Sequence, residues 1–174
     1  MKRLFTATIL VTTILAGAKV ASAQTSTGTL TVTANVVSSI GLTFETDAAG
    51  VSLAGASTNA ATMAFGTISA YGTIASGVTR TVGASDFTVS SPFGVHVVRA
   101  NSTSANYALA VALATADATN TWKVNSTTLT LLNQNLGTSY TYGTTVAHTL
   151  YLTVPLAASS GAISKVINFT ATAN

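Results

Sequence analysis

Residues 161–174 read GAISKVINFTATAN and show the pattern of a half-buried β-strand. The side chains of a strand point alternately to its two faces, so residues of one parity share a face. On one parity this segment carries Ile163, Ile167, Phe169, Ala171 and Ala173, interrupted only by Lys165, and the other parity is mostly polar. One face of the strand is therefore apolar and needs a cover. Because the sequence ends at Asn174, we expect no later strand to cover it.

The segment 29–36, near the other end of the chain, has a matching alternation. Leu30, Val32, Ala34 and Val36 share one parity, and threonine and asparagine lie between them. Both ends of the chain thus predict strands with an apolar face. We therefore expect that a strand of one copy of the protein can be passed to another copy.

Residues 1–23 are typical of a secretory signal peptide. Lys2 and Arg3 give a basic start, residues 4–15 are mostly apolar, and the small residues 21–23 form a cleavage site. The stretch is short and interrupted by threonine, unlike a membrane-spanning helix. We expect the protein to be exported and its mature chain to begin at Gln24.

The positive charge of the chain lies mostly in this predicted signal peptide. The whole sequence has seven basic and four acidic residues, and three of the basic ones, Lys2, Arg3 and Lys19, precede Gln24. The remaining chain is formally neutral and lacks the basic surface that a phosphate backbone requires, so we expect no nucleic-acid partner. Charged residues make up only 6% of the sequence, a composition that suits a protein that lives in an assembly.

From residue 24 onward the sequence predicts a single all-β domain, 24–174. Apolar residues alternate with period two between clusters of glycine, asparagine and serine, without a helical period of useful length. Such a series of short strands is typical of a β-sandwich. Surface loops are expected at 47–61 and 133–145. The predicted strands are 29–37, 40–46, 62–69, 78–82, 87–90, 93–99, 107–114, 128–132, 146–154 and 163–172.

The sequence offers little for catalysis or metal binding. It contains no cysteine, and neither histidine, His96 nor His148, has a carboxylate or second ligand at a useful spacing. His148 shares its parity with Leu150 and Leu152, which predicts a histidine at the rim of a core face. Glu45 and Asp47 alone are too few ligands for calcium, and no Gly-x-Ser-x-Gly motif occurs. We expect no enzymatic activity, no metal and no cofactor.

Four aromatic residues leave a second kind of function open. Trp122, Tyr140, Tyr142 and Tyr151 would form a platform for sugars if their rings converged, although such residues more often fill or cap a core. The alternative that follows is a monomeric carbohydrate-binding adhesin domain.

Several segments resemble one family, the chaperone-usher pilins, and within it the archaic class and its relatives similar to spore coat protein U. Residues 28–42 begin with a glycine and continue as an alternating strand with a short turn, and residues 63–68 (MAFGTI) are similar to the aromatic-glycine strand of these pilins. The C-terminal strand follows Gly161, where pilins commonly have glycine. The chain departs from many members in lacking cysteine and in having Ala173 as its penultimate residue.

This resemblance implies an incomplete immunoglobulin-like β-sandwich, which strand exchange between subunits completes. The N-terminal segment of one subunit would fill a groove in the next. With the alternation above, it gives Leu30, Val32 and Ala34 as donor residues, and Ile163, Ile167 and Phe169 as residues of the acceptor groove.

The resemblance also implies the function and partners of the protein. It would be the structural subunit of a cell-surface fimbria or pilus that serves adhesion or biofilm formation. Identical subunits would form a homopolymer, exported through the periplasm with the help of a periplasmic chaperone and an outer-membrane usher. A secreted coat or sheath protein similar to spore coat protein U is the alternative within the same family.

Overall fold

The computed structural model describes residues 27–174, and the predicted signal peptide, 1–23, lies outside the described residues. The chain divides after Asn35, and residues 27–35 are described apart from Val36–Asn174. No strand forms in 27–35, where the side chains are exposed. Among the described residues no helix occurs, and hence none with the length and apolar character to cross a membrane.

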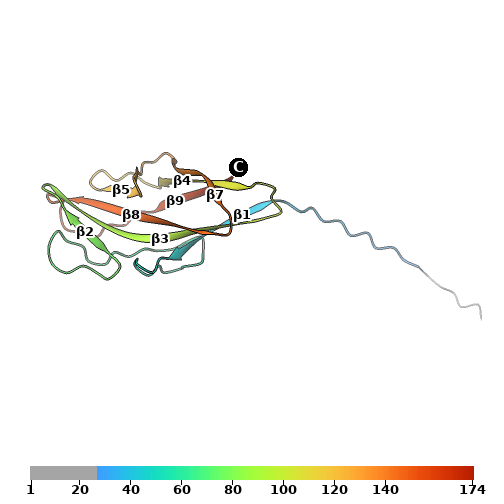
Figure 1. Ribbon diagram of the computed structural model, residues 1–174, viewed down its shortest axis with the longest axis horizontal. Coiled ribbons are helices and arrows are strands. Elements are labelled where there is room, and N and C mark those ends of the chain that lie inside the picture. The colour runs from blue at the N-terminus through green and yellow to red at the C-terminus, as the bar shows by residue number, and fades with distance from the viewer. Residues whose placement is uncertain (1–26) are drawn as a thin grey trace, which may run out of the picture. The chain divides into compact units, whose positions relative to one another are not determined.

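The part Val36–Asn174 consists of two antiparallel sheets, which confirms the prediction of a sandwich-like all-β fold. The larger sheet has the order β1-β3-β8-β5-β6, with β2 also paired to β3, and the smaller has the order β7-β4-β9. Figure 1 shows the strands of the smaller sheet in a layer beside β3 and β8. The strands are β1 (Ser39–Thr46), β2 (Thr79–Val82), β3 (Asp86–Ala100), β4 (Asn106–Leu113), β5 (Thr121–Val124), β6 (Thr127–Thr128), β7 (Gln134–Thr141), β8 (Thr145–Pro155) and β9 (Ile167–Ala173).

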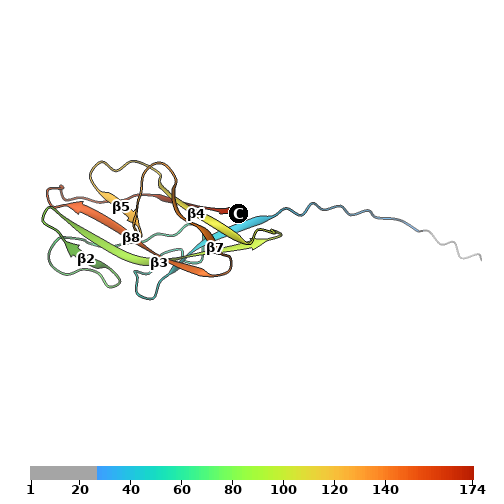
Figure 2. The ribbon, with the colours of Figure 1, turned by 45° about the horizontal axis from the view of Figure 1, so that its top comes forward.

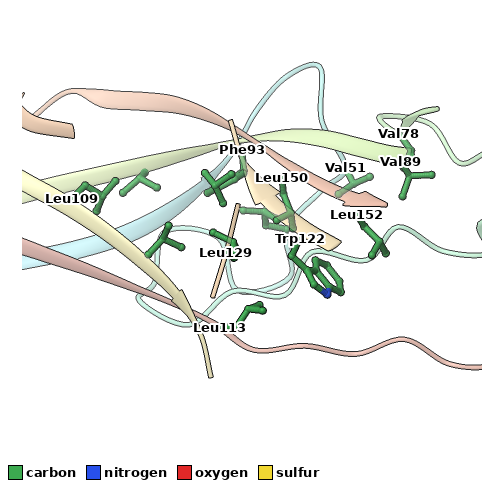
Figure 3. Packing of buried hydrophobic residues seen from close by; sticks show 14 of the residues in the cluster. Val51, Val78, Val89, Phe93, Leu109, Leu113, Trp122, Leu129, Leu150 and Leu152 are labelled. Carbon is green, nitrogen blue, oxygen red and sulfur yellow. The ribbon is translucent and has the colours of Figure 1, made fainter. Parts of the chain in front are cut away.

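The core fills the space between the two sheets. Leu109 and Leu113 of β4 lie opposite side chains of β3 and β8, such as Phe93 and Leu150 (Figure 3). Alternate residues of each strand are buried, as in β8, where the even-numbered residues from His148 to Val154 face inward. Burial of this apolar surface is the main favourable term in folding. The fully buried aliphatic side chains of the core are Leu109, Leu152, Val89, Val95, Val97, Val111 and Val124.

Strand β3 runs without a break through Pro92, where the sequence predicted two separate strands, 87–90 and 93–99. Pairing with β1 ends at Phe93 and pairing with β2 begins at Ser90, so Pro92 lies in the gap between them. The carbonyl of Ser90 faces β2 and accepts a bond from the hydroxyl of Thr79. Residues of the same parity, Pro92 included, point their backbone groups to this side. The N–H that proline lacks is therefore not needed by any strand.

Other strand predictions were wrong in position. Residues 62–69 form no strand, apart from a single bridge between Thr62 and Ala54. The expected loop 133–145 instead contains β7, and residues 29–37 are not a strand. The last strand begins at Ile167, later than predicted, because its partner β4 ends at Leu113, the residue that pairs with Ile167.

Candidate functional site

Two edge strands from different sheets face each other along one side of the sandwich. Strand β1 pairs with β3, and β9 pairs with β4, and neither has a second partner strand in 27–174. The arrows of Figures 1 and 2 show that β1 and β9 run in opposite directions. No backbone hydrogen bond joins these two strands within the described chain, so this side of the sandwich is an open seam.

A groove of about 660 Å³ follows the open seam. Its apolar lining comes from alternate residues of β1, from the start of β9 and from Val98 of β3. No charged side chain lines it. The lining residues are Ile40, Gly41, Leu42, Thr43, Phe44, Ser57, Thr58, Asn59, Val98, Ile167, Asn168 and Phe169.

The predicted acceptor residues separate in the structure. Ile167 and Phe169 lie together in this groove, and both pack against the core cluster. Ile163 lies before β9, is 39% exposed, and lines a different hollow of about 260 Å³ beside Asn120 and Val154. Of the predicted acceptor residues, therefore, only the two that belong to β9 line the groove at the seam.

The rings of Phe44 and Phe169 form the floor of the groove, and the ring of Phe93 packs against both. The rings of Phe44 in β1 and Phe169 in β9 meet edge to face, with centroids 5.2 Å apart. Both rings contact Phe93 of β3, which is buried, at centroid distances of 6.4 and 5.7 Å. Edge-to-face aromatic pairs are favourable beyond the area they bury. The floor is thus apolar and fixed in geometry, and it joins the two sheets beneath the open seam.

The backbone of β9 has free hydrogen-bonding groups along the open seam. At one end the carbonyl of Val166 accepts from the N–H of Ala114, and at the other the N–H of Asn174 donates to the carbonyl of Asn106. Antiparallel pairing alternates, so the even-numbered residues between them bond to β4 and the odd-numbered ones point away. The outward groups are the N–H and carbonyl groups of Ile167, Phe169, Ala171 and Ala173, and they have no hydrogen-bond partner within the described chain.

The backbone of β1 shows the same alternation, with one difference. Phe44 points its N–H and carbonyl away from β3, where they bond to the carbonyl of Thr58 at 2.9 Å and the N–H of Ser57 at 2.7 Å. By alternation Ile40 and Leu42 also point away from β3, and their outward groups have no partner among residues 27–174. Ile40, Leu42 and Phe44 were not among the predicted groove residues, although they alternate in the printed sequence.

The opposite side of the sandwich is closed. There the chain passes directly from β6 in the larger sheet to β7 in the smaller one. Within this connection the carbonyl of Thr130 accepts from the N–H of Leu113 in β4 at 2.7 Å. On this side the chain itself links the two sheets. Comparisons with protein-family models, curated proteins and solved structures found no match. The function is therefore inferred from the geometry of the chain.

The predicted donor residues lie in the segment 27–35. Leu30 is 87% exposed and Val32 is 79% exposed, and Ala34 is exposed too. The segment contains no charged residue. Large apolar side chains with this much exposure, on one parity of an uncharged segment, are typical of a surface that binds a partner.

The four aromatic residues weighed for sugar binding do not form one platform. Trp122 is buried and donates from Nε1 to Asp117 at 2.8 Å. Tyr140 and Tyr142 instead pack on Tyr107, with centroids 5.4 and 5.2 Å away. In the described part of the chain no ring contact joins either of them to Trp122 or Tyr151. Most of these rings fill the core or cap it.

His148 is a core residue, where the sequence predicted one at the rim. It is 2% exposed, and its Nδ1 lies 3.0 Å from Nδ2 of Asn125. The N–H of Thr149 donates to Oδ1 of the same amide, so Nδ2 is the atom that faces the ring and donates to it. Burial lowers the pKa of His148, which favours the neutral ring that accepts this bond. Within 27–174 no group of histidine and acidic side chains is arranged to hold a metal.

Proposed function

We propose that this protein is the structural subunit of a surface fimbria or pilus, assembled by donor-strand complementation. The N-terminal segment of one subunit inserts into the groove between β1 and β9 of the next. The observation that carries this proposal is the open seam, in which unpaired backbone groups of two edge strands border an apolar floor. In this proposal the fold is an incomplete immunoglobulin-like sandwich that the neighbour's strand completes.

The physical chemistry of the seam favours such an insertion. An edge strand with free N–H and carbonyl groups is a template for another strand, and an inserted strand would pair on both sides. It would also cover the half-buried rings of Phe44 and Phe169. Burying an apolar side chain of the size of leucine or valine contributes about 1.5–3 kcal/mol, so Leu30 and Val32 together would contribute several kcal/mol.

The donor segment and the groove match in character. Leu30, Val32 and Ala34 place apolar side chains on one face, and threonine occupies the intervening positions. Both the segment and the groove lining lack charge, so insertion buries no ion. Because donor and acceptor are different surfaces, the contact is head-to-tail and extends into a polymer of identical subunits.

The proposal includes the partners that the family resemblance implies. An open apolar groove needs a cover before the donor strand arrives, and a periplasmic chaperone would supply it. An outer-membrane usher would then pass subunits to the cell surface, where the fibre would serve adhesion or biofilm formation. The proposed role is mechanical and involves no catalysis, metal or cofactor.

The test is electron microscopy of material sheared from the surface of the native host, with mass spectrometry of any filaments. We expect thin filaments that contain this chain beginning at Gln24 and that vanish when its gene is deleted. A variant lacking residues 24–34 is expected to fold without polymerising, and native fibres from that variant would contradict the proposal. A continuous layer in place of filaments would favour the coat or sheath alternative.

A further inference from the structure

The turn at Ser57 and Thr58 occupies one end of the edge that β1 offers to a partner. It bonds to both outward backbone groups of Phe44, the N–H and the carbonyl. Ser57, Thr58 and Asn59 also line the groove at this point. The outward backbone groups of β1 are therefore free at Ile40 and Leu42, whereas those of Phe44 are bonded to the turn.

We propose that this turn is a built-in stop that sets the register of the inserted strand of a second copy. The strand can pair with β1 alongside Ile40 and Leu42, but at Phe44 it would first have to displace the turn. This inference rests on the proposed function and deepens it, since it states how far the donor strand enters the groove.

The turn is held in place by its own hydrogen bonds. Oγ of Ser57 donates to Oε2 of Glu45 at 2.9 Å, and Oγ1 of Thr58 lies 2.7 Å from the carbonyl of Gly55. At its base the backbones of Ala54 and Thr62 bond to each other in both directions, at 3.0 and 2.8 Å. A donor strand that advanced to Phe44 would have to break the two backbone bonds of the turn. It would replace them with two similar bonds, so the exchange brings no net gain in hydrogen bonding.

The two borders of the groove therefore have different lengths of free edge. On β9 the free backbone groups extend from Ile167 to Ala173, whereas on β1 they end at Leu42. Pairing with β9 alone would tolerate a slip of two residues, because such a slip keeps the apolar side chains inward. The turn removes that freedom on the β1 side. One register is thus favoured in spite of the similar side chains of Leu30, Val32 and Ala34.

The natural absence of cysteine makes register measurable by disulfide formation. One subunit carries Leu42→Cys, and a second carries a single cysteine at a position from 29 to 36. The two are assembled together and oxidised, and mass spectrometry identifies the cross-linked pairs. Directly opposite residues of neighbouring strands have Cβ atoms about 4.5–5.5 Å apart, and a disulfide needs about 3.5–4.5 Å, so only directly opposite positions come near enough to cross-link. We expect one dominant donor position when the turn is intact.

The turn is then altered in a matched pair of variants. Ser57→Pro removes the N–H that bonds to Phe44, and the φ of 62° at this residue is also closed to proline. Ser57→Gly keeps the N–H and suits that φ. With Ser57→Pro we expect the cross-link to spread or to shift by about two residues towards deeper insertion, and with Ser57→Gly we expect it to stay in place. An unchanged cross-link in Ser57→Pro would overturn the stop.

Amide hydrogen exchange tests the same inference without changing the turn. In the free subunit the amides of Phe44 and Ser57 should be protected, and those of Ile40 and Leu42 should exchange rapidly. On assembly Ile40 and Leu42 should gain protection. Rapid exchange of Phe44 and Ser57 in the free subunit would contradict the stop. If no donor position cross-links and Ile40 and Leu42 never gain protection, the proposal of strand insertion is contradicted. If they gain protection but the cross-link does not depend on the turn, only the stop is contradicted.

Discussion

The ring of Phe44 meets the ring of Phe169 edge to face, with centroids 5.2 Å apart, although the two residues belong to different sheets. Their strands exchange no backbone hydrogen bond in the described chain. Side-chain packing thus holds the two layers together at the place where backbone pairing is open. The same contact forms the floor on which an inserted strand would rest.

Phe169→Ala is expected to lower the free energy of unfolding by about 2–3 kcal/mol, less than for a fully buried phenylalanine. The change removes the contacts of Phe169 with Phe44 and Phe93 and leaves a void beneath the groove. Urea denaturation measures the loss, and polymer formation should weaken in parallel. The matched control is Thr170→Ala, which alters the exposed face of the same strand. Equal effects of the two variants would contradict the role of the floor.

Val32→Asp is expected to prevent polymer formation while leaving the stability of the free subunit within about 0.5 kcal/mol of the parent. Val32 is 79% exposed, so the fold does not depend on it, but insertion would bury the new carboxylate in an uncharged groove. Sedimentation measures assembly and thermal unfolding measures stability. Thr31→Asp, on the opposite face of the same segment, should still polymerise. A Val32→Asp subunit that polymerises normally would exclude Val32 as a donor residue.

Asp117→Ala is expected to destabilise the protein by about 1–3 kcal/mol at neutral pH, because the buried N–H of Trp122 loses its acceptor. Asp47→Ala is the control, since Asp47 accepts a bond from the exposed amide of Ala49. Both variants are compared with the parent by urea denaturation. A loss in Asp47→Ala as large as in Asp117→Ala would contradict this role of the tryptophan contact.

The pKa of Asp117 predicts the acid range in which the parent loses this contribution. Burial raises the pKa, but hydrogen bonds from Trp122, Asn120 and Thr119 outweigh burial and lower the pKa to about 2 from 3.8. The contribution of the carboxylate is therefore complete above pH 3.8 and is lost as the pH falls through about 2. Stability measured between pH 5 and pH 2 should decrease less steeply in Asp117→Ala than in the parent.

His148 makes stability depend on pH in a milder range. Its pKa in the folded protein lies below the usual 6.5, because burial disfavours the charged ring. The unfolded chain therefore binds the proton first, and stability falls as the pH drops below about 6.5, by at most about 1.4 kcal/mol per pH unit. Urea denaturation at pH 8 and pH 5 measures the fall. His148→Gln should remove this part of the dependence, and His96→Gln should keep it; a dependence that follows His96 would contradict the assignment.

Alternation predicted β1, β4, β8 and the end of β9, since each has one face in the core. It failed for β7, because the ladder between β4 and β7 shifts register near Leu109, and a bulge breaks the period-two pattern. Phe169 and Ile167 could be predicted as groove residues from their parity. The opposite border at Ile40 and Leu42 could not, because it depends on which edge strand the fold brings alongside β9. Ile163 shares their parity, but it lies outside β9, because the partner strand β4 ends at Leu113 opposite Ile167.

In the proposed assembly each subunit receives one strand, in the groove of the seam between β1 and β9. On the other side of the sandwich the chain itself passes from β6 to β7 and so links the two sheets. With one strand to give and one place to receive, every subunit in the proposed polymer has a valence of two. Growth is then unbranched and directional, and its two tips differ: one bears an empty groove and the other an unused strand. A peptide with the sequence of residues 29–36 would seal the first tip and leave the second untouched.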